Sequence, residues 1–265
     1  MPPQSPEQWL DQENSGSIVG NGPGEDANGF LLPEEEIFDD GFWDSTYFPF
    51  EDWENSFEFG LNGTNGNSDT LNIRMGIDTL YEDEAYKRSL KFKYSNKSNN
   101  NQTIAHHINL EGRLEKKLSD RWTYFVHGTT EYDEFKAFDT RVAVDTGFGW
   151  DFLKNDINTL TFRAGLGASY EIGGPNDEVK PELVTGISWE RKIYDNQKLS
   201  FGVEVFPNLE DFADHRVNTT AAWEIDVAPE WGTKLKLSID DRYDSTPGTA
   251  KHNDLDYGFL LLWDF

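Results

Sequence analysis

The chain has 265 residues, of which 36% are apolar and 27% charged, with no cysteine and a formal net charge of −26. The absence of cysteine excludes disulfides, thiol nucleophiles and thiolate metal sites. Such negative charge argues against a general nucleic-acid binder, because phosphate contacts need clustered Lys and Arg. The mean hydropathy of −0.70 and the lack of an apolar run of about 18 residues exclude a transmembrane helix. They leave a transmembrane β-barrel open, since its apolar residues occupy every second position.

The N-terminal part differs from the rest in charge. Residues 1–55 contain 14 Asp and Glu and no base, and the first base is Arg74. We therefore expect residues 1–52 to be a mostly disordered acidic extension and 53–265 to form the folded domain. A solvated spacer is the simpler interpretation of the extension. A docking segment for a periplasmic partner is the alternative, because aromatic residues such as Trp43 and Tyr47 alternate with its acids.

From about residue 56 onward, apolar and polar residues alternate with a period of two. Near the C-terminus, for example, Leu255, Tyr257 and Phe259 share one face, whereas Asp256 and Gly258 share the other. Strict alternation over about ten residues is typical of a strand with one apolar and one polar side. The pattern predicts twelve strands, at 56–64, 69–82, 86–97, 102–118, 122–133, 138–153, 159–172, 179–194, 197–208, 215–228, 233–244 and 254–265.

The predicted connections alternate in length. Those after the second, fourth, sixth, eighth and tenth strands are tight, as at Asp83-Glu84, whereas others are longer and polar, as at 98–101 and 245–253. An even number of antiparallel strands with short turns on one rim and longer loops on the other is typical of an outer-membrane barrel. We therefore predict an all-β fold, a twelve-stranded antiparallel up-and-down transmembrane β-barrel preceded by the disordered acidic extension.

The aromatic rings indicate which face meets lipid. Aromatic residues make up 14% of the chain, and on the predicted strands they sort by strand end, as the girdles of a membrane barrel do. The alternative is the ordinary core of a soluble β-sandwich, which gives no reason for such sorting. The tryptophans near the short-turn rim are Trp122, Trp150, Trp189, Trp223, Trp231 and Trp263, and the tyrosines near the long-loop rim are Tyr94, Tyr132, Tyr170 and Tyr243.

The opposite face then lines the lumen and carries charges of both signs. These charges either set the selectivity of a narrow pore or form a plug that rigidifies the barrel, and the pattern does not separate the two. The candidate lumen residues are Glu58, Arg74, Asp78, Lys91, Lys93, Glu111, Arg113, Glu131, Arg141, Asp145, Arg163, Glu190, Glu204, Arg216, Glu224, Lys236, Asp240 and Arg242.

Several stretches resemble the salt-induced outer membrane protein family, a group of bacterial β-barrels of unknown function. The resemblance covers about 56–265 and implies location and architecture more than an activity. The terminal Phe265 looks like the C-terminal signal read by the barrel assembly machinery. The matching stretches are Phe59–Asn72, Glu131–Phe135, Asp139–Arg141, Gly147–Trp150, Phe206–Arg216 and Asp241–Pro247.

Signals for chemistry are weak. The acids of 210–216, together with His215, could bind a divalent cation. More often such a run of charged residues forms a solvated loop, here held to the strand end by Arg216. His106 points outward, as in a lipid-face hydrolase, yet no outward serine can be placed beside it. His127 is interpreted as hydrogen-bonded filling of the lumen. We therefore predict no enzyme, no cofactor and no metal site.

The preferred function is a narrow channel for ions or small solutes in the outer membrane of a Gram-negative bacterium, linked to salt or osmotic stress. A non-conducting envelope barrel with a charge-plugged lumen is the alternative, and a lipid-face hydrolase is a remote one. The short turns and both termini would face the periplasm. Expected partners are outer-membrane lipid and the barrel assembly machinery, but not nucleic acid.

Overall fold

The computed structural model describes residues 53–66, 69–174, 178–248 and 250–265. The predicted N-terminal extension, 1–52, lies outside the described residues. The described chain forms twelve strands that close into one antiparallel barrel, as predicted. The strands are β1 (Glu54–Thr64), β2 (Thr70–Glu82), β3 (Tyr86–Asn99), β4 (Gln102–Lys117), β5 (Trp122–Asp133), β6 (Thr140–Lys154), β7 (Asn158–Ile172), β8 (Val179–Tyr194), β9 (Gln197–Pro207), β10 (His215–Ala228), β11 (Thr233–Asp244) and β12 (Asn253–Asp264).

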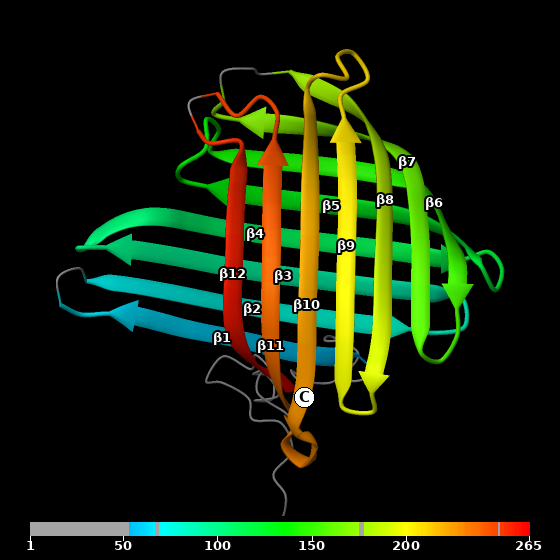
Figure 1. Cartoon of the computed structure of the whole chain (residues 1–265). Coiled ribbons are helices and arrows are strands. Elements are labelled where there is room, and N and C mark those ends of the chain that lie inside the picture. The colour runs from blue at the N-terminus through cyan, green and yellow to red at the C-terminus, as the bar shows by residue number, and fades with distance from the viewer. Residues whose placement is uncertain (1–52, 67–68, 175–177, 249) are drawn as a thin grey trace, which may run out of the picture. The chain divides into compact units, whose positions relative to one another are not determined.

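Each strand pairs with its neighbours in sequence, and β1 pairs with β12 to close the ring. In Figure 1, strands β8–β12 stand upright at the front and β1–β5 run across behind them. A single 3-10 turn, η4 (Pro229–Trp231), joins β10 to β11. Among the described residues, no helix is long and apolar enough to span a membrane.

Short polar turns hold one rim together. The carboxylate of Asp83 accepts hydrogen bonds from the backbone N–H groups of Tyr86 and Ala85, each at 2.7 Å. These two bonds favour the charged form and lower the pKa of Asp83. Asn155 forms the same kind of turn by accepting from the backbone of Asn158 at 2.8 Å. The rim with these connections is called the short-turn rim, and the opposite one the long-loop rim.

The connection between β3 and β4 differs from the prediction. A four-residue polar loop was expected at 98–101, but β3 continues to Asn99 and leaves a two-residue turn of Asn100 and Asn101. Both asparagines have positive φ, 48° and 62°. Asparagine tolerates this left-handed conformation, which two-residue hairpin turns require. A tight hairpin therefore stands on the long-loop rim.

The two faces of the sheet are inverted relative to a soluble barrel. Apolar side chains on the outer face are largely exposed, as at Val144 with 56% and Leu166 with 57% of their surface accessible. Charged side chains such as Arg74, Arg141 and Asp145 are buried inside. This is the arrangement that a lipid-facing barrel needs, because its outside meets hydrocarbon and its inside meets water.

The wall is tightest where glycines face each other across β6 and β7. Gly147 and Gly165 are cross-strand partners. A Cβ atom added to Gly165 would lie 2.2 Å from the carbonyl oxygen of Thr146 and 2.9 Å from the Cα of Gly147. Only glycine allows the two backbones to approach this closely.

Closure of the barrel is incomplete along its length. β1 pairs with β2 from Glu54 to Thr64, but with β12 only from Ser56 to Phe59. Figure 1 shows β1 and β12 diverging from this shared segment toward the long-loop rim.

Candidate functional site

A cavity of about 900 Å³, here called the vestibule, occupies the short-turn half of the lumen. Its position follows from its lining, which includes Glu54 at the start of β1 and Phe265 at the end of the chain. The candidate lumen residues that line it are Glu58, Arg74, Asp78, Lys91, Lys93, Glu111, Arg113, Arg163, Glu190, Glu204, Glu224, Lys236 and Asp240. The other five, Glu131, Arg141, Asp145, Arg216 and Arg242, lie outside it.

Most charges of the vestibule wall are paired. Asp240 accepts hydrogen bonds from Arg74 and Lys93, both at 2.9 Å. Lys236 donates to Glu58 at 2.7 Å. Because charges removed from bulk water are costly unless paired, these contacts allow the wall to carry both signs. Two further pairs join strands that are not neighbours, Arg113 with Glu204 at 2.8 Å and Arg163 with Glu115 at 3.0 Å.

Four charged groups of the vestibule lack such partners. Asp78 and Lys91 are cross-strand neighbours on β2 and β3, Glu190 lies on the opposite wall, on β8, and Glu54 begins β1 at the rim. None of the four belongs to an ion pair within 4.0 Å in the part of the chain that the structure describes. They are therefore less firmly held than the paired charges and more available to a solute.

Beyond the vestibule, an ion-pair network spans the lumen toward the long-loop rim. Strands β5 and β11 stand opposite each other in the barrel, and Arg242 of β11 donates to Glu131 of β5 at 3.1 Å. Arg141 of β6 donates to Asp244 of β11 at 2.8 Å and to Glu171 of β7 at 2.5 Å. The bonds to Glu131 and Asp244 span the lumen, whereas Arg141 and Glu171 are cross-strand partners on neighbouring strands. The long-loop cluster comprises His107, Glu131, Asp133, Arg141, Glu171, Arg242 and Asp244.

Phenylalanine rings beneath arginines fill the same region. The guanidinium of Arg141 lies 4.2 Å from the ring centroid of Phe138, and that of Arg216 lies 4.9 Å from the ring of Phe206. Phe138 was predicted to begin a strand, but β6 starts at Thr140. Phe138 instead lies in the loop after β5 and is buried, because its ring packs under Arg141. Packed rings and ion pairs together leave little room for solvent here.

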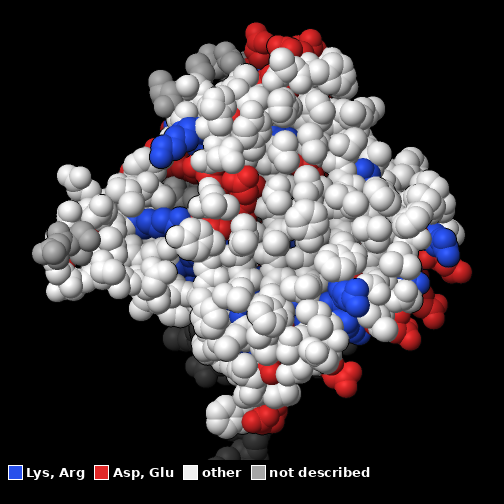
Figure 2. All heavy atoms as spheres, in the orientation of Figure 1, with Lys and Arg blue, Asp and Glu red and all other residues white. Residues whose placement is uncertain are grey.

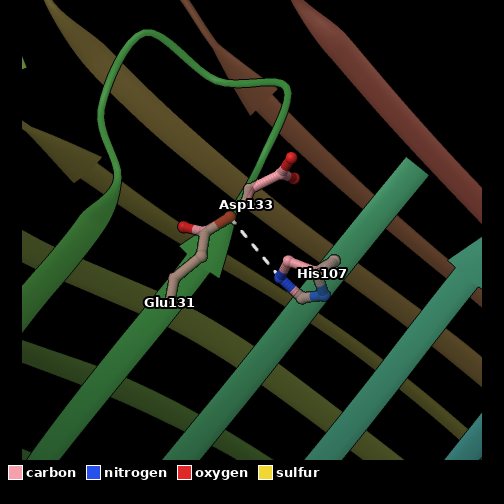
Figure 3. A group of neighbouring side chains, drawn as sticks. All are labelled: His107, Glu131 and Asp133. Atoms are coloured by element: carbon pink, nitrogen blue, oxygen red, sulfur yellow. Dashed lines mark ion pairs between the residues drawn. The ribbon is translucent and has the colours of Figure 1, made fainter. Parts of the chain in front are cut away.

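The long-loop cluster contains one group with metal-ligand character, His107, Glu131 and Asp133. Figure 3 shows His107 and Glu131 turned toward each other from neighbouring strands, with Asp133 beside them; His107 Nε2 lies 3.6 Å from Glu131 Oε1. However, Glu131 also contacts Arg242 and Arg141. A cation placed among the three ligands would be repelled by both guanidiniums, so the group acts as an ion-pair network.

The acidic loop 210–216 is held by hydrogen bonds from residues outside it. Asp214 accepts from Thr246 at 2.6 Å, Lys180 at 3.0 Å and Asn208 at 3.3 Å. Burial raises the pKa of Asp214, but these three hydrogen bonds outweigh it and lower the pKa below its ordinary value. Arg216 ties the following strand to Glu182 through two bonds, at 2.7 and 2.8 Å. The arrangement is that of an anchored loop.

The aromatic residues named from the sequence lie toward the ends of their strands. Trp122 begins β5 and stacks on Trp150, with ring centroids 6.1 Å apart. Trp263 stacks on Phe57 near the end of β12. Trp189 and Trp223 lie toward the short-turn ends of β8 and β10, and Tyr94, Tyr132, Tyr170 and Tyr243 lie toward the long-loop ends of their strands.

Two histidines that the sequence singled out, His106 and His127, each contact a carboxylate. His106 lies between the rings of Tyr94 and Tyr132, and its Nδ1 is 3.0 Å from Glu134. A serine, which a hydrolase of this kind would need as its nucleophile, is not among these contacts of His106. His127, inside the lumen, is 2.8 Å from Asp145 through Nδ1, so the two form a buried pair.

Some buried lumen residues were not predicted from the alternation. Glu182 and Glu115 are buried and hold Arg216 and Arg163, respectively. Each shares the face of residues that were selected, since Glu115 follows Glu111 and Arg113 at spacings of two. Lys136 lies in a loop and pairs with Asp254 at 2.7 Å, for which alternation offers no signal.

These features define a class of protein, a twelve-stranded β-barrel with an apolar exterior and a charged lumen open at one end. The chain belongs to the DUF481 family of proteins of unknown function, which matches residues 57–265. No curated protein sequence matches the chain.

Solved structures of similar shape include porins and channels. The chain is similar to the NanC porin, with 12% identity, 79% of this chain and 97% of that chain covered, and a TM-score of 0.47. It is similar to an outer membrane channel from Pseudomonas putida F1 (8% identity, 80% and 94% covered, TM-score 0.47). It is also similar to the KdgM porin in complex with disordered oligogalacturonate (6% identity, 80% and 99% covered, TM-score 0.46).

Proposed function

We propose that this protein is an outer-membrane channel for small charged solutes, closed at its long-loop end by the long-loop cluster. The observation that carries the proposal is the combination of an apolar exterior with a charged vestibule open at the short-turn rim. In this orientation the short turns face the periplasm and the aromatic rims lie at headgroup depth. Phe265 at the chain end would serve as the signal for the assembly machinery.

The vestibule favours ions or solutes that carry charge. Its wall presents Lys91, Asp78 and Glu190 without ion-pair partners among the described residues, so a solute can exchange its water for contacts of either sign. Passage beyond the vestibule requires the pairs Glu131–Arg242 and Arg141–Asp244 to separate, because both span the lumen. A role in salt or osmotic stress rests on the family resemblance, and its test is the amount of protein in cells grown at low and high salt.

The test uses two neighbouring positions on β9. Ser200 lines the vestibule, whereas Phe201 is exposed on the outer face. Because the chain contains no cysteine, Ser200→Cys and Phe201→Cys each carry a single thiol. In lipid vesicles, a charged, membrane-impermeant maleimide should label Ser200→Cys and label Phe201→Cys only after detergent is added. Labelling of Phe201→Cys without detergent would contradict the membrane barrel.

A second candidate is a non-conducting envelope barrel. The observation that favours it is the packing of Phe138 and Phe206 under arginines in the long-loop half. Such a barrel would show the same labelling pattern but would carry no current even after the long-loop cluster is weakened. A lipid-face hydrolase has less support, because His106 contacts Glu134 and two tyrosine rings.

A further inference from the structure

The closing contact between β1 and β12 leaves a seam in the wall. Cross-strand pairing stops at Phe59 opposite Leu261. If the ladder continued in the same register, Leu61 would face Phe259, but the structure contains no such pair. Gly60 still packs against Leu260, since a Cβ added to it would lie 2.6 Å from Leu260 Cδ2. The seam therefore lies between Leu61–Gly63 of β1 and Asn253–Phe259 of β12, in the long-loop half. In hydrocarbon, unpaired backbone N–H and C=O groups along such an edge are costly.

Side-chain ion pairs span the inner side of this seam. Arg74 of β2 reaches Asp240 of β11, and Lys97 of β3 reaches Asp256 of β12. Lys93 of β3 also reaches Asp240. Both β1 and β12 lie between β2 and β11 in the strand order, so these side chains cross the gap that the backbone leaves. In the orientation of Figure 1, Figure 2 shows acidic and basic atoms in a hollow between β12 and the ends of β1–β4.

One group at the seam has unused hydrogen-bonding capacity. The side chain of Arg74 is 10% exposed, and its Nη1 is buried without a hydrogen-bond partner. This nitrogen lies over Gly258 of β12, since a Cβ added there would be 2.7 Å from it. A buried guanidinium N–H without an acceptor is unfavourable, so the site suits an acceptor that arrives with a ligand.

Charge and polarity at the seam favour an amphiphile. On the inner side, three bases, Arg74, Lys93 and Lys97, share two carboxylates, Asp240 and Asp256. This excess of positive charge favours an anionic group. On the outer side, the edges are apolar and exposed, and they comprise Leu61, Leu255, Tyr257 and Phe259.

The vestibule adjoins the seam, because Arg74, Lys93 and Asp240 line both. We propose that the seam is a lateral portal that binds a single-chain amphiphile, with its anionic head on Arg74 and its apolar chain between β1 and β12. The portal would connect the vestibule with the outer leaflet. The seam extends over only a few residues of β1, which favours one chain over a two-chain phospholipid. The proposal rests on the proposed membrane location.

The first test asks whether the seam is open in a membrane. Leu61→Cys with Phe259→Cys would place two thiols face to face only if the ladder continued, and Phe57→Cys with Trp263→Cys is the matched control within the ladder. In lipid vesicles under oxidant, the control pair should cross-link and the seam pair should stay reduced. Cross-linking of both pairs would overturn the portal alone. Failure of the control pair would overturn the barrel and, with it, the proposed function.

The second test asks what binds there. Diazirine-bearing palmitate should label β1 and β12 near the seam after illumination, and Arg74→Gln should weaken this labelling by about tenfold, the equivalent of one charge-assisted hydrogen bond. Arg74→Lys should retain part of it. Diazirine-bearing phosphatidylglycerol should show no preference for the seam. Equal labelling of all strands by palmitate, labelling insensitive to Arg74, or a preference of the two-chain probe for the seam would each overturn the proposal.

Discussion

Arg141 is the residue whose loss should damage the closed lumen most. It is 7% exposed and contacts three carboxylates from three strands, Glu171 at 2.5 Å, Asp244 at 2.8 Å and Glu131 at 3.7 Å. Its guanidinium also covers the ring of Phe138. The substitution Arg141→Gln keeps a polar side chain but removes the positive charge that these groups share.

The three carboxylates do not contribute equally to the loss of stability in Arg141→Gln. Glu131 keeps Arg242, and Asp244 keeps the backbone N–H of Thr246 at 2.9 Å. Glu171 accepts hydrogen bonds from Arg141 alone among the described residues. Removing one partner of a buried pair costs about 3–5 kcal/mol, because the other charge stays buried and uncompensated. We therefore expect Arg141→Gln to lower the free energy of unfolding by about 3–5 kcal/mol, mainly through Glu171.

The assay is urea unfolding of the protein in lipid vesicles, followed by tryptophan fluorescence. The double variant Arg141→Gln with Glu171→Gln should recover part of the loss, because it also removes the uncompensated charge. Lys154→Gln, a control on an exposed side chain of the short-turn rim, should change stability by less than about 0.5 kcal/mol. This reasoning would be refuted if Arg141→Gln had the same free energy of unfolding as the wild type. It would also be refuted if the double variant were less stable than the single variant.

Three more perturbations test other parts of the structure. Gly165→Val should impair folding, because the carbonyl of Thr146 occupies the space of the new Cβ; normal refolding yields would contradict the close approach. The lowered pKa of Asp214 means that its contribution to stability is present above its unfolded pKa and is lost as the pH falls through its folded pKa. Asp214→Asn should thus destabilise at neutral pH and converge with wild type in acid, and a difference that persists in acid unfolding curves would refute this. Val144→Arg on the exposed outer face should cost about 2–4 kcal/mol in vesicles, whereas Phe212→Arg in a loop should cost under about 0.5 kcal/mol; equal costs would contradict the lipid face.

The strands were predictable because alternation is a local property. Each segment, such as 159–172, shows its two faces without reference to any neighbour, and the ends differ from the structure by at most two residues. The face of each charge follows from the same alternation.

Contacts across the lumen were not predictable from the pattern. Arg141 was expected to line the lumen, but whether it meets Asp244 of β11 depends on strand tilt and shear. Phe138 continues an alternating pattern and was therefore expected in a strand. Its burial under Arg141 is a tertiary interaction that overrides local preference.

The seam is a similar case. Phe57, Phe59 and Leu61 alternate without interruption, as do Leu255, Tyr257 and Phe259, so the two strands predict a full-length ladder. Cross-strand pairing stops after Phe59, and no local signal marks that point.

The most direct measurement of the central claim is single-channel conductance in planar bilayers. The wild type should be almost silent, because Glu131 and Arg242 bridge the lumen above the vestibule. A variant with Glu131→Gln, Arg242→Gln and Asp244→Asn loses the charged bridges to β11 and should give discrete steps that grow with salt concentration. Arg121→Gln, an exposed control in a short turn, should behave as wild type. Steady large currents through the wild type would contradict closure by the long-loop cluster, and silence of both proteins would contradict the channel.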